Sequence, residues 1–457
     1  MKNKTMLTDL YQLTMNAAYF ENKKDDIATF DLFIRKLPED WSYFIACGVE
    51  DAIDYATSIK FEDEDIEYLR SQGLFKEDYL QFLKNFKFEG EIYAVSEGTP
   101  VAPNTPILRV TAKRTQAQLL ETTLLNIINF QTMIATKARR VVMAAGRADV
   151  IDFGLRRAQG EDAALKGARA AYIAGAIATS NVKAGKEYGI PIAGTHAHSF
   201  VMSFPTELDA FRAYVKTFPE NATLLIDTYD TENGARNAAI IAKELETKGK
   251  KLGAVRLDSG DLCDLSKKVR EILDKQDLQY VKIFASNDLN EYKIKDLRKS
   301  GAKIDGFGVG TEMITAKPVA AISGVYKLVE DNDGPKIKLS EDKRSYPGKK
   351  QVYRFWEIAT NYYHGGKYIL YDLLALEGER IELGKMIIRP GVADGIYTQA
   401  IPLLEQVIKE GRRIRKKPTL EEIRENARID GGHPMKISEG LQKLVDDLTE
   451  KYGGRTK

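Results

Sequence analysis

The sequence predicts an α/β protein built around parallel strands, and a barrel is favoured over an open sheet. Six short apolar runs between residues 149 and 311 each end in small or polar residues, and a helical stretch follows each run. Such alternation produces parallel strands joined by right-handed crossovers. Gly, Asp, Ser and Thr gather where the runs end, at the edge where parallel α/β folds bind ligands. The 43% hydrophobic content is sufficient for a large core.

The region before these runs mixes strands and a helix. Residues 28–36 (ATFDLFIRK) alternate apolar and polar side chains, which predicts a strand. Residues 91–112 read as short strands separated by the loop residues SEGTPVAPNTP. Residues 115–145 carry apolar side chains at helical spacing, which predicts one long amphipathic helix.

The central runs predict six parallel strands. They are VIDFG (150–154), IPIAGT (190–195), TLLIDT (223–228), GAVRLDSGD (253–261), KIFASND (282–288) and DGFGVGT (305–311). After about residue 323 the alternation stops, and residues 325–338 (VYKLVEDNDGPKIK) predict a hairpin around Asn-Asp-Gly. The basic run 409–417 (KEGRRIRKK) predicts a solvated helix end and linker, with a nucleic-acid contact as the alternative.

Composition excludes several classes of protein. The 457 residues suit two or three domains, and a net charge of +2 argues against a dedicated nucleic-acid binder. No apolar run approaches the ~20 residues that span a bilayer, and Asp9 precedes any apolar segment of a secretory signal. Cys47 and Cys263 lie far apart without further Cys or His at ligand spacing. We expect a soluble cytoplasmic protein that uses neither membrane nor nucleic acid.

Two of the four histidines, His196 and His198, share the segment GTHAHSF. A pair at i, i+2 on a strand would point to opposite faces, which disfavours joint metal binding. Two interpretations stay open at this point. Either both are ordinary polar residues of a loop, or one serves as nucleophile or acid–base at a strand end.

Other predicted strand ends supply charge. These residues are Arg156, Arg157, Asp227, Asp230, Arg256, Asp258 and Asp261. Such a set fits a phosphorylated substrate that carries magnesium, or else a ring of structural ion pairs. The segment GFGVGT (306–311) permits close backbone approach, so its N–H groups could hold a phosphate or diphosphate.

Taken together and in this order, the motifs resemble the nicotinate phosphoribosyltransferase family. The resemblance covers about the first 355 residues. The matching segments are LTDLYQLTM (7–15), DFGLRRAQG, ATSNV (178–182), GTHAHSF, LLIDTYDT, RLDSGDL, SND, GFGVGTEM and KLSEDKRSYPGKKQVYR (338–354).

The resemblance implies a two-domain fold of the type II phosphoribosyltransferase kind. A mixed α/β domain (1–113, with strands from about 325–400) would pack on an irregular, TIM-like α/β barrel (114–324). The C-terminal region (325–457) would add strands and then helices that pack back on both domains. A homodimer is also implied, in which the N-terminal segment of one subunit closes the barrel mouth of the other.

The resemblance further implies the reaction. Nicotinate and 5-phosphoribosyl 1-diphosphate would give nicotinate mononucleotide and diphosphate, coupled to hydrolysis of ATP through a phosphohistidine, with Mg²⁺ as cofactor. By the same resemblance His198 takes the phosphoryl group and Asp227 holds its imidazole in the nucleophilic tautomer. Asp258 lies near the ribose, where a carboxylate could stabilise positive charge and hold magnesium. The exact metal ligands are left open.

The remaining matched positions are expected to bind substrate. They are Tyr11, Phe153, Arg156, Ser180, Thr195, Arg256, Asn287, Gly310 and Thr311. The two aromatic residues would sandwich the pyridine ring, and the two arginines would meet phosphate and carboxylate charges. Thr195 would supply a hydroxyl, Asn287 would meet the ribose, and the last two would receive phosphates.

Three alternatives are weighed. Nicotinamide phosphoribosyltransferase is similar, but Ser180 stands where that relative carries an aspartate, which would repel a carboxylate substrate. A non-catalytic barrel that binds sugar phosphates would lack at least one reacting group, and none is missing here. A barrel aldolase needs a lysine at a strand end, which none of the six has. Beyond about residue 360 no function is assigned, including to His364 and His433.

Overall fold

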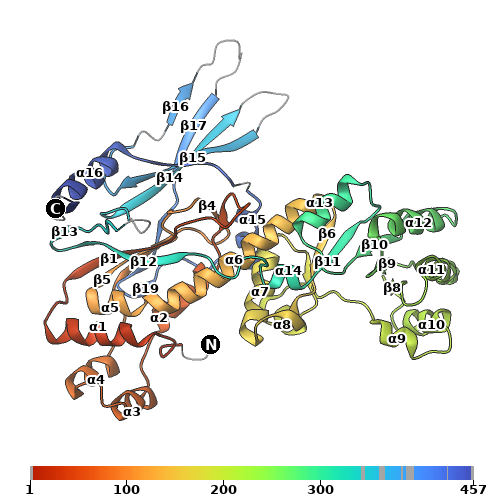
Figure 1. Ribbon diagram of the computed structural model, residues 1–457, viewed down its shortest axis with the longest axis horizontal. Coiled ribbons are helices and arrows are strands. Elements are labelled where there is room, and N and C mark those ends of the chain that lie inside the picture. Colours follow the sequence, from red (N-terminus) through yellow and green to blue (C-terminus); the bar gives the residue numbers. More distant parts are fainter. Residues whose placement is uncertain are drawn as a thin grey trace. The chain divides into compact units, whose positions relative to one another are not determined.

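The computed structural model describes residues 4–340, 345–359, 366–381, 384–387, 396–429 and 431–453. The chain divides into two compact units, one formed by Met1–Met133 with Ala321–Lys457 and the other by Ile134–Ala320. The first division falls inside the long helix α6 (Glu121–Ala145) rather than before it. Figure 1 shows the helices and strands of both units.

The first unit contains a seven-stranded sheet in the order β13-β12-β1-β5-β3-β18-β19. Its strands are β1 (Ile27–Ile34), β3 (Glu91–Ala94), β5 (Leu108–Lys113), β12 (Gly324–Asp331), β13 (Gly334–Pro335), β18 (Glu405–Lys409) and β19 (Arg412–Arg413). The strand predicted at 28–36 is confirmed as β1, which pairs antiparallel with β12 and β5. The predicted hairpin at 325–338 is confirmed as well, because Asp331 pairs with Gly334.

A second sheet of this unit has the order β16-β17-β14-β15-β20, and a small one joins β2 to β4. The bounds are β2 (Phe44–Ile45), β4 (Pro100–Val101), β14 (Lys350–Ala359), β15 (Gly366–Leu376), β16 (Gly384–Ile387), β17 (Ile396–Pro402) and β20 (Met435–Ile437). The helices outside the second unit are α1 (Leu10–Glu21), α2 (Val49–Ser58), α3 (Asp63–Ser71), α4 (Glu77–Lys84), α5 (Arg114–Leu119), α15 (Leu420–Ala427) and α16 (Glu439–Gly453).

The second unit is a curled, six-stranded parallel sheet in the order β7-β6-β11-β10-β9-β8, flanked by helices (Figure 1). Its strands are β6 (Asp149–Asp152), β7 (Ala178–Thr179), β8 (Thr223–Leu225), β9 (Ala254–Leu257), β10 (Lys282–Ala285) and β11 (Gly306–Val309). This half-barrel confirms the predicted α/β barrel class. Aliphatic side chains such as Leu224, Val255 and Ile283 are fully buried between these strands and the helices around them.

Besides the C-terminal part of α6 and one 3₁₀ turn at Leu155–Arg157, eight helices are described for this second unit. They are α7 (Glu161–Ile173), α8 (Val182–Tyr188), α9 (His198–Met202), α10 (Glu207–Thr217), α11 (Thr231–Glu246), α12 (Leu262–Asp274), α13 (Glu291–Lys299) and α14 (Thr311–Ile314). Several begin with side-chain caps directly after a strand, since Asp230, Asp261 and Asn290 each accept backbone N–H groups of the first turn. The polar residues that follow the strands therefore partly serve to start helices.

Three predictions need correction. Residues 190–195 do not form a strand of the sheet but pair with Thr179 through a single bridge, since Pro191 has no N–H to donate. The predicted helix 115–145 is two helices, α5 and α6, because the N–H of Leu120 bonds back only three residues to Ala117. The basic run 409–417 is not a helix end. It includes β19, and Arg413 and Arg415 form ion pairs with the buried Glu50.

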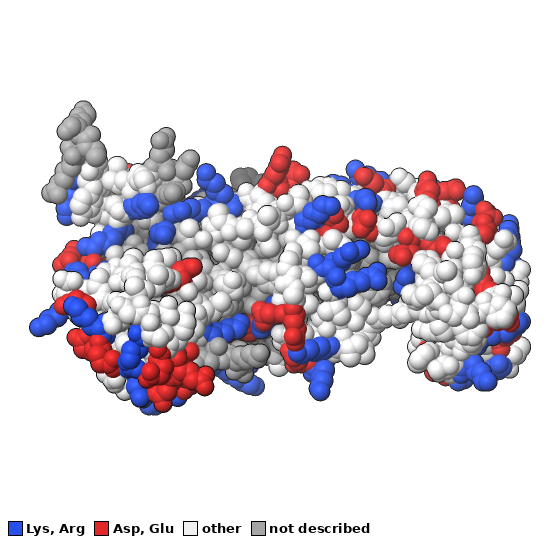
Figure 2. Space-filling model, turned by 60° about the horizontal axis from the view of Figure 1, so that its bottom comes forward, with Lys and Arg blue, Asp and Glu red and all other residues white. Residues whose placement is uncertain are grey.

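Surface charge is mixed. Figure 2 shows basic and acidic side chains interspersed over the face in view. None of the helices in the described ranges is long and apolar enough to cross a membrane. Of the two histidines left without a function, His433 donates from Nε2 to Oδ2 of Asp372 at 2.8 Å, whereas His364 lies outside the described residues.

Candidate active site

A cleft of about 590 Å³ opens at the carboxyl ends of the parallel strands, within the second unit. The predicted site residues that line it are Phe153, Arg156, Ser180, Thr195, His198, Arg256, Asp258, Asn287, Gly310 and Thr311. Further lining residues are Leu155, Arg157, Gly194, His196, Ala197, Ser286, Asp288 and Gly308. Side chains from six separate chain segments meet here because parallel strands present all their carboxyl ends at one edge.

Two predicted residues lie elsewhere. Asp227 follows β8 and is not among the residues that line the cleft. Its Oδ2 accepts the N–H of Asp258 at 2.8 Å and the hydroxyl of Ser259 at 2.6 Å. Its Oδ1 is buried without a hydrogen-bond partner among the described residues. Tyr11 belongs to the first unit, on α1, and is 48% exposed.

His198 is the first residue of α9, and a hydrogen bond holds its ring at Nδ1. Nδ1 lies 3.1 Å from the hydroxyl of Thr228, and Nε2 lies 3.8 Å from Oδ2 of Asp258. When Nδ1–H donates to Thr228, Nε2 keeps a free lone pair directed at the cleft. Thr228 thus takes the position at Nδ1 that we expected for Asp227, whose orienting role stays a prediction.

Arg256 and Asp258 form the charged centre of the cleft. Nη1 of Arg256 donates to the Thr195 hydroxyl, and Nη2 lies 3.8 Å from Oδ2 of Asp258. Burial lowers the pKa of Arg256, while Asp258 and Asp227 act to raise it. A guanidinium remains charged under such shifts, so Arg256 presents a poorly solvated cation to the cleft. The hydroxyl of Ser286 donates to the other oxygen of Asp258 and fixes the carboxylate.

His196 plays a different part from His198. It is 8% exposed, and its Nε2 accepts the backbone N–H of Leu225 at 3.2 Å. Burial lowers the pKa of His196 to about 4, so the ring is neutral near pH 7 and carries its proton on Nδ1. Neither nitrogen then offers a free lone pair, and His196 anchors the loop to β8.

The backbone of the cleft is shaped for close approach. A Cβ built on Gly308 would lie 2.4 Å from the Phe153 ring. Any residue larger than glycine at this position would therefore clash with the ring in its present position. Asn287 has a left-handed φ of 96°, a conformation that asparagine tolerates better than most residues and that clusters at functional sites. Both features lie where the substrate is expected.

Several site residues were not predicted from the sequence. Thr228, Ser286, Asp288 and Gly308 each lie beside a residue that was chosen, or within a motif that was. A small polar residue next to a strand end is a weak signal by itself, because such residues also cap helices. The roles of these residues follow only from their contacts with residues of other strand ends, such as those of Thr228 with His198 and of Ser286 with Asp258.

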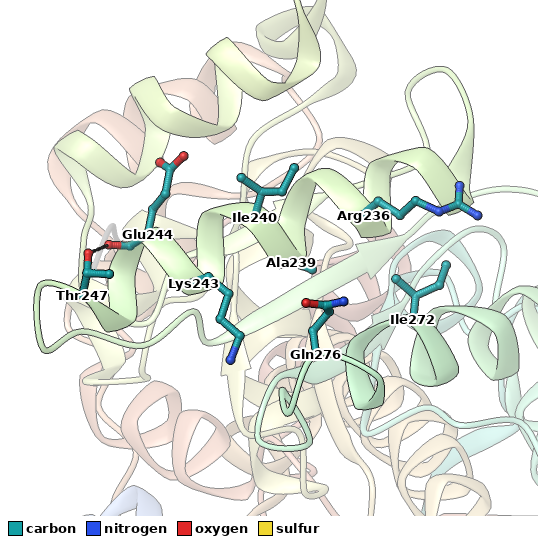
Figure 3. A pocket seen from close by; sticks show the side chains of 8 residues that line it. All are labelled: Arg236, Ala239, Ile240, Lys243, Glu244, Thr247, Ile272 and Gln276. Atoms are coloured by element: carbon teal, nitrogen blue, oxygen red, sulfur yellow. Dashed lines mark hydrogen bonds between the residues drawn. The ribbon is translucent and has the colours of Figure 1, made fainter.

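A second hollow lies on the outer side of the sheet, along α11 and α12. It is lined by Arg236, Ala239, Ile240, Lys243, Glu244, Thr247, Ile272 and Gln276, and Figure 3 shows these side chains with the hydrogen bond from Thr247 to the carbonyl of Glu244. Its charged groups already have partners. Glu244 pairs with Arg212 at 2.7 Å, and Lys243 with Glu246 at 3.0 Å. The cleft at the strand ends is therefore the better candidate for chemistry.

Comparison with known proteins agrees with this choice. Residues 6–129 match the profile described as the nicotinate phosphoribosyltransferase (NAPRTase) N-terminal domain, and residues 148–351 match the nicotinate phosphoribosyltransferase (NAPRTase) family. A nicotinate phosphoribosyltransferase of Mycobacterium tuberculosis is 42% identical over 93% of this chain and 86% of its own length. One of Bacillus subtilis is 43% identical over 82% of this chain and 78% of its own.

Solved structures give the same result. Human nicotinic acid phosphoribosyltransferase superposes with a TM-score of 0.80 at 28% identity, over 96% of this chain and 99% of that chain. A nicotinate-nucleotide pyrophosphorylase of Pyrococcus furiosus superposes with a TM-score of 0.70 at 25% identity, over 93% of this chain and 94% of that chain. With its strand-end cleft and this degree of identity, the chain belongs to the nicotinate phosphoribosyltransferase family.

Proposed function

We propose that this protein forms nicotinate mononucleotide and diphosphate from nicotinate and 5-phosphoribosyl 1-diphosphate, with coupled hydrolysis of ATP. The observation that carries the proposal is the cleft itself. An aromatic ring (Phe153), arginines, a carboxylate (Asp258) and a histidine with a free lone pair (His198) converge there in a member of this family. The relatives in Mycobacterium tuberculosis and Bacillus subtilis are named nicotinate phosphoribosyltransferases, which supports the phosphoribosyl transfer.

The glycosyl step accounts for the charged groups. When diphosphate leaves, positive charge develops on the ribose and negative charge on the leaving group, and fixed opposite charges stabilise both. Asp258, held by Ser286, would lie beside the sugar. The arginines and the turn at Gly310 and Thr311 would meet phosphate oxygens.

The ATP step would use Nε2 of His198. This nitrogen attacks the γ-phosphorus, a P–N bond forms as the bond to ADP breaks, and hydrolysis later returns free histidine and inorganic phosphate. Thr228 holds the proton on Nδ1 throughout. The phosphoryl group would add charge beside the substrate diphosphate. ATP energy would thereby act on binding and release rather than on the glycosyl step.

Mg²⁺ is compatible with the cleft. Within the described ranges no three His, Cys, Asp or Glu side chains cluster as a metal cage, but Mg²⁺ commonly uses one or two carboxylates together with substrate phosphates. Asp258 is the lining carboxylate that would hold it, with Asp288 as the second acid of the cleft. The ion would neutralise charge on the diphosphate.

We also propose a homodimer with shared active sites, acting in the cytoplasm. Three large hydrophobic side chains near the N-terminus are exposed to solvent: Leu7 (45% exposed), Leu10 (55%) and Tyr11 (48%). Exposed hydrophobic side chains that lie close together are typical of a surface that binds another protein. At the strand ends of the second unit, Leu155 and Tyr229 are also exposed. The segment around α1 of one subunit would cover the cleft of the other. Neither Cys47 nor Cys263 forms a disulfide within the described residues, which fits a reducing compartment.

The direct test is identification of the product. Purified protein is incubated with 5-phosphoribosyl 1-diphosphate and either nicotinate or nicotinamide, with and without ATP. We expect nicotinate mononucleotide as the main product and faster turnover with ATP. A preference for nicotinamide, or no mononucleotide from either base, would reject the proposal.

A substitution at Ser180 tests the choice of base. Ser180 lines the cleft, and its replacement by aspartate would place a second carboxylate near that of nicotinate. We expect Ser180→Asp to weaken the use of nicotinate by about 1–3 kcal/mol through charge repulsion in a partly buried site. The measurement is the ratio of kcat/KM for nicotinate and nicotinamide, with Ser180→Asn as a neutral control of similar size. An unchanged ratio would show that Ser180 does not face the base.

A further inference from the structure

Asp152 is a buried carboxylate for which the proposed reaction has no use. It ends β6 and is 1% exposed, and burial raises its pKa. Its stabilising contacts among the described residues are neutral: Oδ1 accepts the N–H of Gly154 at 2.9 Å, and Oδ2 accepts the hydroxyl of Thr179 at 2.7 Å. A carboxylate buried without a cation is costly, so its contacts need an explanation.

These contacts form a hydrogen-bond network between the end of β6 and the end of β7. The Thr179 hydroxyl, while it donates to Asp152, also accepts the N–H of Asn181 at 3.0 Å. The backbone adds a parallel link, because the N–H of Ser180 donates to the carbonyl of Asp152 at 2.8 Å. Asp152, Thr179 and Asn181 are all at least 98% buried. Water therefore cannot readily replace these bonds.

This hydrogen-bond network lies directly beside two residues that line the cleft. Phe153 lies between Asp152 and Gly154, and Ser180 lies between Thr179 and Asn181. Both bracketed residues line the cleft, whereas the bracketing side chains do not. The N–H of Phe153 is tied to Val309 at 2.9 Å, and Gly308 leaves room for its ring. The network thus sets the turn that carries the ring and the turn that carries the hydroxyl.

We propose that Asp152 and Thr179 are positioning residues that fix the Phe153 ring relative to Ser180, and so set the affinity for the pyridine substrate and the choice between nicotinate and nicotinamide. This inference rests on the proposed function, in which these two lining residues meet the base. Neither Asp152 nor Thr179 touches substrate. Loss of their hydrogen bond should affect the pyridine more than the sugar phosphate, which is met by other strand ends.

The test uses two substitutions of Thr179 that separate the role of its hydroxyl from that of its methyl group. Thr179→Val keeps the shape but loses the hydroxyl, both as donor to Asp152 and as acceptor from Asn181, whereas Thr179→Ser keeps the hydroxyl and loses the methyl group. We expect Thr179→Val to raise the KM for nicotinate about tenfold, equivalent to about 1.4 kcal/mol. The KM for 5-phosphoribosyl 1-diphosphate and kcat should stay within about a factor of two, and Thr179→Ser should restore the nicotinate KM. The selectivity between nicotinate and nicotinamide should fall in parallel.

The partner substitution checks that the two residues act together. Asp152→Asn leaves one acceptor oxygen, so the amide cannot accept from both the Gly154 N–H and the Thr179 hydroxyl as the two carboxylate oxygens do. The double variant should be no worse than the poorer single variant, because both substitutions disrupt the same interaction. Asp149→Asn is the matched control at the other end of β6, where Asp149 pairs with the exposed Lys282 at 3.2 Å. It should change neither KM. Thermal unfolding is followed for every variant, and kinetics are compared below the lowest melting temperature.

The outcomes separate the possibilities. A lower melting temperature with an unchanged nicotinate KM would overturn the inference, since it would show a structural role alone. Equal rises in both KM values would overturn it too. If wild-type protein makes no nicotinate mononucleotide, the proposed function fails, and equilibrium binding of nicotinate to Thr179→Val and Thr179→Ser still decides the positioning role. Equal binding by these two variants would reject it.

Discussion

His198→Ala is expected to lose ATP hydrolysis and phosphoenzyme formation altogether. The alanine has no nitrogen to attack the γ-phosphorus, and within the described part of the chain His198 is the histidine of the cleft that keeps a free lone pair. Slow phosphoribosyl transfer should survive at high substrate concentration, because the charges that stabilise the glycosyl step remain in place. Labelling with γ-³²P-ATP and product formation without ATP are the two measurements.

His196→Ala is the matched control, two residues away in the same loop. Its ring is neutral and bound to Leu225, so it should not accept phosphate, and its loss should affect activity much less. The contact of Thr228 with the His198 ring allows a finer comparison. Thr228→Val should slow phosphorylation without abolishing it, since the ring loses orientation but keeps its nucleophile. ATP hydrolysis by His198→Ala that still depends on nicotinate would contradict this assignment.

Tyr11→Ala and Arg256→Ala are each expected to be nearly inactive alone, yet about a quarter of wild-type activity should return when the two are mixed. In the proposed dimer, Tyr11 of one subunit completes the cleft that holds Arg256 of the other. A mixed dimer therefore has one site with both lesions and one with neither. With random exchange of equal amounts, about half the dimers are mixed and half of their sites are intact, which follows from the two-fold symmetry.

The measurement requires proof that subunits have exchanged. Differently tagged variants are unfolded or diluted and mixed, and the unfractionated mixture is assayed for the expected quarter of wild-type activity. Purification through both tags leaves only mixed dimers, so activity should then rise to about half. If Tyr11 is a residue of its own subunit's site or core, every mixed dimer carries one lesion in each site and activity stays near the level of the single variants. Such a result in a doubly purified sample would disprove the shared site.

Much of the fold followed from local pattern. Local sequence pattern predicted the strand β1, the Asn-Asp-Gly turn at the start of β13 and most of the parallel strands. These elements depend on the periodicity and type of neighbouring residues, which can be seen in the sequence. The residues at the strand ends also converged as expected, because parallel strands end at a common edge. Residues 190–195 were misjudged, since an apolar run with a proline can lie beside a strand without extending the sheet.

The sequence by itself determined the fold class, the family and the set of chemical groups at the strand ends, because these depend on composition, order and short-range periodicity. Only the tertiary structure decided which groups meet. It placed Thr228 rather than Asp227 at Nδ1 of His198, and it paired Arg413 with the buried Glu50. It also linked Asp152 to Thr179. Hydrogen bonds and ion pairs of this kind depend on angstrom distances between segments far apart in the chain, which no local pattern encodes.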